Sequence, residues 1–203
     1  IKLLQSTLTV GSMTGLSRIA GLVRDIVFAQ FLGSGLLADA FFVAFRIPNF
    51  FRRIFAEGAF SVAFVPVYSG YEAQVGGACT GEFLDFMSGR LGLILLSLTA
   101  LGTIGAPVLV TMIAPGFLDH PEKFEATTKA LRLTFPYLFF ISFVAMAGGI
   151  LNTRERFAVP AITPLFLNVC LIGAVFLLVP RMENAAVALG LGVLIAGIVQ
   201  LAF

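Results

Sequence analysis

The chain has 203 residues, of which 59% are hydrophobic and only 12% are charged, and its mean hydropathy is +1.01. Soluble globular domains contain about 25% charged residues, so this composition excludes an ordinary soluble domain and favours a protein that spans a membrane. The formal net charge of +2 is too small to favour a nucleic-acid partner.

Six long apolar segments follow one another along the sequence. They cover residues 3–32, 36–71, 84–113, 130–152, 158–180 and 184–203, and each has the roughly 20 residues that a helix needs to cross a bilayer. The first is predicted to be a retained helix rather than a signal peptide, because charged residues interrupt it and no small-residue cleavage site follows. The connections are too short to hold a separate domain. The sequence therefore predicts an all-α integral membrane protein with six transmembrane helices.

The orientation of these helices rests on one loop. Basic residues of the connections divide evenly between the two sides of the membrane, so their count favours neither orientation. Arg154 and Arg156 in "TRER" form a tight pair close to two helix ends, which favours a cytoplasmic position for that loop. With an even number of helices between them, the amino terminus is then also expected to be cytoplasmic.

Side chains that would support catalysis or metal binding are few. His120 is the only histidine, and Cys79 and Cys170 are the two cysteines, so a zinc site would lack ligands and no disulfide is expected. The stretch "GSGLLADA" has one G-x-G without a third glycine, which is a poor match to a dinucleotide site. The sequence therefore predicts no enzyme, no metal site and no cofactor held by this chain.

The first two segments carry charge that is unusual in a membrane helix, because residues 17–60 contain five arginines and three acids. At 3.6 residues per turn, one face of the first helix combines Gly11, Thr14, Arg18, Gly21 and Asp25, and one face of the second combines Asp39, Phe42, Arg46, Asn49, Arg53 and Glu57, with Arg52 beside it. Pro48 removes a backbone hydrogen bond from the second helix and is expected to kink it, so the freed carbonyl needs protein or water as a partner. Both features indicate a hydrated internal cavity.

An arginine near the centre of a membrane helix costs roughly 2.5–3.5 kcal/mol on insertion scales, so this cluster needs partners or a ligand. The sequence offers some partners, since Arg24 adjoins Asp25 and Arg53 lies four residues from Glu57. Positive charge remains in excess, and guanidinium groups match phosphate oxygens, so an anionic ligand is predicted. Two alternatives stay open. The arginines of the second helix can reach lipid headgroups at a membrane interface, and the glycines of the first helix can serve close helix packing.

Five stretches carry a family resemblance: "SRIAGLVRD", "DAFFVAFRIPNFFRRIFAEGAFSVAFVPVY", "APGF", "LRLTFPYLFFIS" and "GILNTRERFAVPAITPLFLN". They closely resemble the MurJ (MviN) family of lipid II flippases, within the multidrug, oligosaccharidyl-lipid and polysaccharide exporter superfamily. The resemblance implies translocation of undecaprenyl-diphosphate-linked muropeptide across the bacterial cytoplasmic (inner) membrane for peptidoglycan biosynthesis. It also implies alternating access between two lobes, driven by a coupling ion or the membrane potential. Lipid II, membrane lipids and cell-wall synthesis proteins are the partners it implies.

The resemblance also suggests roles for the charged residues of the first two helices. We expect Arg18 and Arg24 to bind the diphosphate directly and Arg52 to support them. Arg53 with Glu57, and Asp39, are expected to hold or switch the shape of the cavity through ion pairs. Orienting roles are expected for Ser17, Asn49 and Asp25.

Members of the family have two lobes, and the six predicted helices correspond to the first of them. The sequence ends within the apolar run "AGIVQLAF", so we expect an N-terminal lobe, 1–203, with the C-terminal lobe absent. Other functions stay open as alternatives. One is a flippase for another polyprenyl-diphosphate glycan, which has the same electrostatic needs. Another is a non-transporting membrane scaffold for cell-wall synthesis, which would not need buried arginines. A cation-coupled drug exporter is less favoured, because its cavity would need acids.

Overall fold

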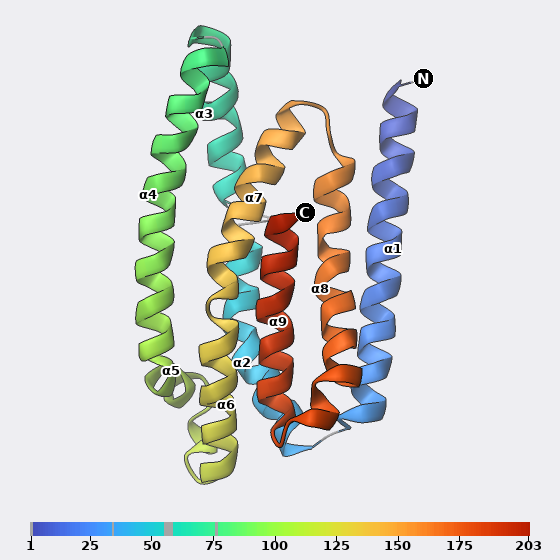
Figure 1. The fold of residues 1–203 in the computed structure, drawn as a ribbon, viewed down its shortest axis with the longest axis vertical. Coiled ribbons are helices and arrows are strands. Elements are labelled where there is room, and N and C mark those ends of the chain that lie inside the picture. The colour runs from blue at the N-terminus through green and yellow to red at the C-terminus, as the bar shows by residue number, and fades with distance from the viewer. Residues whose placement is uncertain (1, 34, 55–58, 76) are drawn as a thin grey trace.

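The computed structural model describes residues 2–33, 35–54, 59–75 and 77–203, and these ranges contain nine α-helices and no strand. The helices are α1 (Lys2–Phe31), α2 (Leu36–Arg52), α3 (Ala59–Val75), α4 (Gly77–Ile104), α5 (Ala106–Ile113), α6 (Pro121–Thr134), α7 (Tyr137–Thr153), α8 (Ala158–Leu177) and α9 (Ala185–Ala202), with 3-10 turns at Pro115–Phe117 and Val179–Arg181. The long helices stand side by side along the long axis of the molecule (Figure 1). The predicted all-α class is confirmed.

The helix boundaries differ from the six predicted segments in three places. Residues 36–71 are described as α2 and α3 rather than as one helix. Residues 84–113 are divided at Gly105, where the backbone leaves helical geometry (φ −78°, ψ 6°), and α5 then starts with a proline near its first position. The segment predicted to begin at residue 130 begins at Pro121 and turns at Pro136, because a proline has no N–H to continue α6.

Four segments in the described part of the chain are long and apolar enough to cross a membrane. They are Gly81–Ile104, Pro121–Thr153, Ala158–Arg181 and Ala185–Ala202. On α4, Leu93, Leu101 and Ile104 are exposed, as expected for a helix whose outer face meets lipid tails. This pattern confirms that the chain is a multi-pass membrane protein.

Helix α9 lies at the centre of the bundle and packs against its neighbours through glycines (Figure 1). A Cβ added at Gly192 would lie 2.7 Å from Cβ of Ala174 on α8, and one added at Gly197 would lie 2.9 Å from Cδ2 of Tyr137 on α7. Small residues allow such close approach, which is the main source of helix association in membranes. The start of α9 is fixed by Asn184, whose Oδ1 accepts hydrogen bonds from two backbone N–H groups of the first turn.

Helices α1 and α4 lie on opposite flanks of this centre (Figure 1). Helix α1 packs along α8, and α3 joins α7 through the small cluster of Phe64, Tyr68 and Met146. Because α1 rests chiefly on one neighbour, side-chain contacts between α1 and α8 decide how firmly it is held.

Pro48 in α2 leaves one backbone carbonyl without its helical hydrogen bond, as the sequence predicts. Pro48 has no N–H to donate to the carbonyl of Ala44, so that carbonyl lacks its helical partner. The hydroxyl of Thr134 on α6, which is fully buried, lies 3.3 Å from this carbonyl oxygen and 3.2 Å from that of Leu131 on its own helix. Its single proton is thus shared between two acceptors, and a protein side chain supplies the freed carbonyl with a donor from α6.

Candidate functional site

A cavity of about 580 Å³ lies among α1, α2, α7, α8 and α9. Its apolar lining comes largely from phenylalanines of α1 and α2 and aliphatic residues of α7 and α8. Its polar lining consists of Arg24, Asn49, Arg52, Tyr137, Asn152, Thr163, Asn168 and Gln200. Among the described residues that line this cavity there are two guanidinium groups and no carboxylate, and the nearest carboxylate partner of Arg24, Asp25, lies outside the lining. A volume of this size suits the head of a ligand rather than a whole lipid.

Arg24 reaches the cavity from α1 and is held on two sides. Its Nε and Nη2 donate to Oδ1 of Asp25 at 3.0 and 2.7 Å, and its Nη1 donates to Oδ1 of Asn168 on α8 at 3.0 Å. A quarter of the Arg24 side chain is exposed, whereas Asp25 is 64% exposed. The ion pair therefore lies at the edge of the cavity, with water able to reach the carboxylate.

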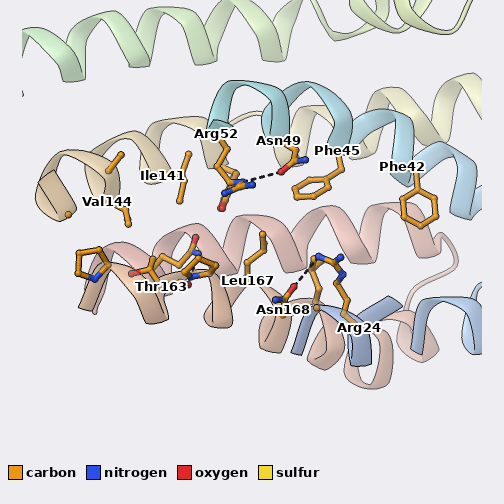
Figure 2. Close-up of a pocket in the computed structure, with 18 of the residues that line it drawn as sticks. Arg24, Phe42, Phe45, Asn49, Arg52, Ile141, Val144, Thr163, Leu167 and Asn168 are labelled. Carbon is orange, nitrogen blue, oxygen red and sulfur yellow. Dashed lines mark hydrogen bonds between the residues drawn. The ribbon is translucent and has the colours of Figure 1, made fainter. Parts of the chain in front are cut away.

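Asn168 links α8 to α1 with both ends of its amide. Its Oδ1 accepts from Arg24, and its Nδ2 donates to the backbone carbonyl of Ser17 at 3.1 Å. Gly21 lies opposite this amide, and a Cβ there would come within 3.6 Å of Nδ2. In Figure 2 the side chains of Arg24 and Asn168 point toward one another across the two helices. The amide thus fixes where the guanidinium of Arg24 sits.

Arg52 enters the cavity from α2, on the wall that faces α8 (Figure 2). Its Nε donates to Oδ1 of Asn49 at 3.0 Å, one helical turn earlier. Asn49 lines the cavity as well, which places it where an orienting role was expected. The predicted residues Arg24, Arg52 and Asn49 are therefore brought together around one cavity.

The other predicted residues that the structure describes lie outside the cavity lining. Arg18 is exposed on α1, and Arg53 is exposed at the C-terminal end of α2, where its backbone N–H caps the helix. Ser17 takes part through its backbone carbonyl rather than its hydroxyl. Glu57 lies outside the described residues, so its expected pairing with Arg53 stays a prediction.

Asp39 forms an ion pair with Lys123, a residue that is distant in the sequence. Its Oδ2 accepts from Nζ of Lys123 on α6 at 2.8 Å. The Lys123 side chain is only 16% exposed, while that of Asp39 is 57% exposed. The ammonium also lies 4.2 Å from the ring centroid of Phe117. This ion pair joins the first turn of α2 to the first turn of α6.

Sequence reasoning missed the polar residues of α7, α8 and α9. Asn168, Thr163, Tyr137 and Gln200 are polar residues within largely apolar helices. A buried polar residue in a membrane helix is itself a signal of function, and this signal was available in "PLFLNVCL". Lys123, by contrast, sits in a polar stretch, and nothing in the sequence indicates its partner.

In the described ranges, no group of three or more His, Cys, Asp or Glu side chains lies close enough together to hold a metal ion. The fold and the cavity together define a class: multi-pass helical membrane proteins with an internal cavity lined by arginines.

Comparison with known proteins identifies the family within this class. A family model described as "Lipid II flippase MurJ" matches residues 28–203, and the chain belongs to this family. The "Probable lipid II flippase MurJ" of Vibrio cholerae serotype O1 is 46% identical over 209 residues, which cover 100% of this chain and 40% of the relative. Its counterpart in Haemophilus influenzae is 43% identical over 198 residues, covering 94% and 39% of the two chains.

A solved structure agrees with the sequence comparison. "Lipid II flippase MurJ, inward closed conformation" matches with a TM-score of 0.81 at 32% identity, covering 96% of this chain and 40% of that chain. The chain thus spans about 40% of the length of the relatives it matches. These matches and the apolar helices indicate a multi-pass protein of the bacterial inner membrane. The family is named for transport, which fits the expectation that the chain is not an enzyme.

Proposed function

We propose that the chain is the N-terminal lobe of a lipid II flippase and that its cavity binds the diphosphate of lipid II during translocation. The observation that carries the proposal is the cavity lining, where the described residues include Arg24 and Arg52 and no carboxylate. Family membership supports the same substrate.

The physical need for such a cavity follows from the substrate. Moving an ionised phosphate from water into a medium of low dielectric costs far more than thermal energy, because the charge loses its hydration. Guanidinium groups in a hydrated cavity replace part of that hydration through charge-assisted hydrogen bonds of about 2.7–2.9 Å. The apolar rest of the lipid stays in the surrounding bilayer, so only the head must enter the protein.

The Arg24 guanidinium keeps N–H donors with which it can bind the diphosphate of lipid II. A guanidinium has five N–H donors. Three of them are used by Asp25 and Asn168, which leaves one N–H on Nη1 and one on Nη2 without a partner in the described part of the chain. Two donors on neighbouring nitrogens are the number that a bidentate contact with phosphate requires. Arg24 is therefore proposed as the direct ligand, and Arg52 as its support.

Residues outside the cavity are proposed to act on conformation. The Asp39–Lys123 ion pair connects two helix starts and is placed to hold one arrangement of α2 against α6. Arg53 and Glu57 are proposed as a second such pair, and Arg18 as a ligand that joins the site in another conformation. A coupling ion or the membrane potential is proposed to drive the cycle.

A chimeric protein tests the proposed function. The matching 40% of the Vibrio cholerae relative is replaced by this chain, and the chimera is expressed in cells whose own lipid II flippase is depleted. Lipid II on the outer face is measured with a membrane-impermeant reagent. We expect the chimera to restore it, the Arg24→Gln chimera to fail, and an Arg90→Gln chimera to behave like the unaltered one, because Arg90 is exposed on α4 outside the cavity. Full restoration by the Arg24→Gln chimera would contradict the proposal.

A further inference from the structure

One wall of the cavity is polar but uncharged. Tyr137 comes from α7, Thr163 from α8 and Gln200 from α9, and all three line the cavity. Tyr137 is fully buried and Gln200 is 4% exposed. Neither the hydroxyl of Tyr137 nor Oε1 of Gln200 has a hydrogen-bond partner of good geometry in the described ranges, although the two side chains are close neighbours. Two polar atoms without a well-formed hydrogen bond thus lie beside the same cavity.

The direction of the Gln200 amide is fixed by its neighbour. Its Nε2 donates to the backbone carbonyl of Thr163 at 2.9 Å. Because a carbonyl can only accept, the NH₂ end must face Thr163, and Oε1 must face away from it. The subsite therefore presents Oε1 as an acceptor whose neighbouring donor in the protein is the hydroxyl of Tyr137, which makes no well-formed hydrogen bond to it.

The Tyr137 ring is held in place by α9. Gly197 lies three residues before Gln200, so both occupy the same face of α9. A Cβ at Gly197 would lie 2.9 Å from Cδ2 of Tyr137, which shows how closely the ring rests on the helix backbone. With the ring held this way, the position of the hydroxyl is fixed beside Gln200 and the cavity.

Such unpaired atoms are costly and therefore call for an explanation. A buried polar group without a partner destabilises a protein, and native structures satisfy more than about 90% of such groups. Helix α8 adds a further acceptor to this wall. Pro164 has no N–H to donate to the carbonyl of Pro160, and both prolines line the cavity. This wall is thus rich in acceptors that a ligand with N–H or O–H groups would satisfy.

We propose that Tyr137 and Gln200 form a neutral subsite for a hydroxyl or secondary amide of the glycan that the diphosphate carries. The inference rests on the proposed function, since it names a second part of the same substrate. An ionised phosphate offers only acceptors and cannot satisfy Oε1 of Gln200, whereas a sugar hydroxyl or an N-acetyl group offers a donor. The cavity then has two chemically distinct halves, with arginines for the diphosphate and neutral groups for the sugar.

Two lipid probes separate these halves. Undecaprenyl diphosphate carries the diphosphate alone, and lipid II carries the same diphosphate with its glycan and peptide. Binding of each to the 203-residue chain in detergent is measured by native mass spectrometry, and thermal stability without lipid is measured by circular dichroism. The variants are Tyr137→Phe, Gln200→Met and Arg24→Gln. Tyr68→Phe is the matched control, because Tyr68 is also fully buried but lies outside the cavity lining.

We expect Tyr137→Phe and Gln200→Met each to weaken lipid II binding about two- to tenfold, the size of one lost hydrogen bond. Binding of undecaprenyl diphosphate should not change. The lipid-free melting temperature should stay level or rise, because each change removes an unpaired buried atom. Arg24→Gln should weaken both lipids, and Tyr68→Phe should leave the ratio of the two affinities unchanged.

Two results would overturn the subsite. An unchanged ratio of affinities in Tyr137→Phe and Gln200→Met would mean that these atoms bind only a water molecule. A lower melting temperature with equal losses for both lipids would mean a structural role. If Arg24→Gln left both lipids bound as in the unaltered chain, the proposed function would fail instead, and the two failures are thereby distinguished.

Discussion

Replacing Asn168 by leucine should loosen α1 from α8 and release Arg24. Leucine has a similar volume, so the change removes hydrogen bonds without opening a large void. The bond from Arg24 to Oδ1 spans 3.0 Å, and a hydrogen bond to a charged group contributes about 1.5–3 kcal/mol. The bond from Nδ2 to the Ser17 carbonyl spans 3.1 Å and contributes about 0.5–1.5 kcal/mol.

Two structural details lower the expected sum. The Ser17 carbonyl lies within α1 and keeps its helical hydrogen bond, and Arg24 keeps its contact with Asp25. Water also replaces part of the lost bond, since a quarter of the Arg24 side chain is exposed. We therefore expect the lower part of the combined range, about 2 kcal/mol of destabilisation.

The assay is thermal unfolding in detergent, followed by helical circular dichroism, together with lipid II binding. Asn152→Leu is the matched control, because Asn152 also lines the cavity but is exposed, and its side chain makes no hydrogen bond in the described part of the chain. Asn168→Leu should melt at a lower temperature than this control and bind lipid II more weakly. Equal melting temperatures for the two variants would refute the reasoning that Asn168 holds α1 in place.

Two further predictions concern helix packing. A Cβ at Gly102 would lie 2.1 Å from ring carbons of the buried Phe135, so Gly102→Ala should destabilise the chain by about 1–3 kcal/mol. Gly173→Ala on α8, where nothing lies within 4 Å, should be neutral or stabilising by up to about 1 kcal/mol, and equal melting of the two variants would contradict this contrast. Thr134→Val keeps the side-chain shape but removes the hydroxyl that the Ala44 and Leu131 carbonyls share, which should cost about 1 kcal/mol in thermal unfolding. An unchanged melting temperature would show that another group takes over the Ala44 carbonyl.

Local rules applied to the sequence predicted much of this structure. The length of the apolar segments predicted membrane helices, and Pro48 predicted a freed carbonyl that needs a partner. Neither rule identified Thr134 as that partner, because it lies on α6, 90 residues from Ala44. Adjacency in the sequence likewise suggested the pair of Arg24 and Asp25, which the structure contains.

The candidate site was harder to predict, because helix periodicity shows which residues share a face but not which face meets a cavity. Arg18 and Gly21 share a predicted face of α1, yet Gly21 lines the cavity and Arg18 does not. Arg24 lies one residue away from that face, yet its side chain lines the cavity, because Asn168 on α8 accepts a hydrogen bond from it there. Contacts between helices that are distant in the sequence decided these positions, and a single sequence does not contain them.

Competition between two anionic lipids tests the central claim most directly. Native mass spectrometry compares lipid II bound to the unaltered chain, to Arg24→Gln with Arg52→Gln, and to Arg90→Gln, each with phosphatidylglycerol in excess. The account predicts selective lipid II binding that is lost in the double variant and kept in Arg90→Gln, because Arg24 and Arg52 line the cavity and Arg90 is not among the described lining residues. Equal lipid II binding by all three chains would contradict the claim that the cavity arginines bind the diphosphate.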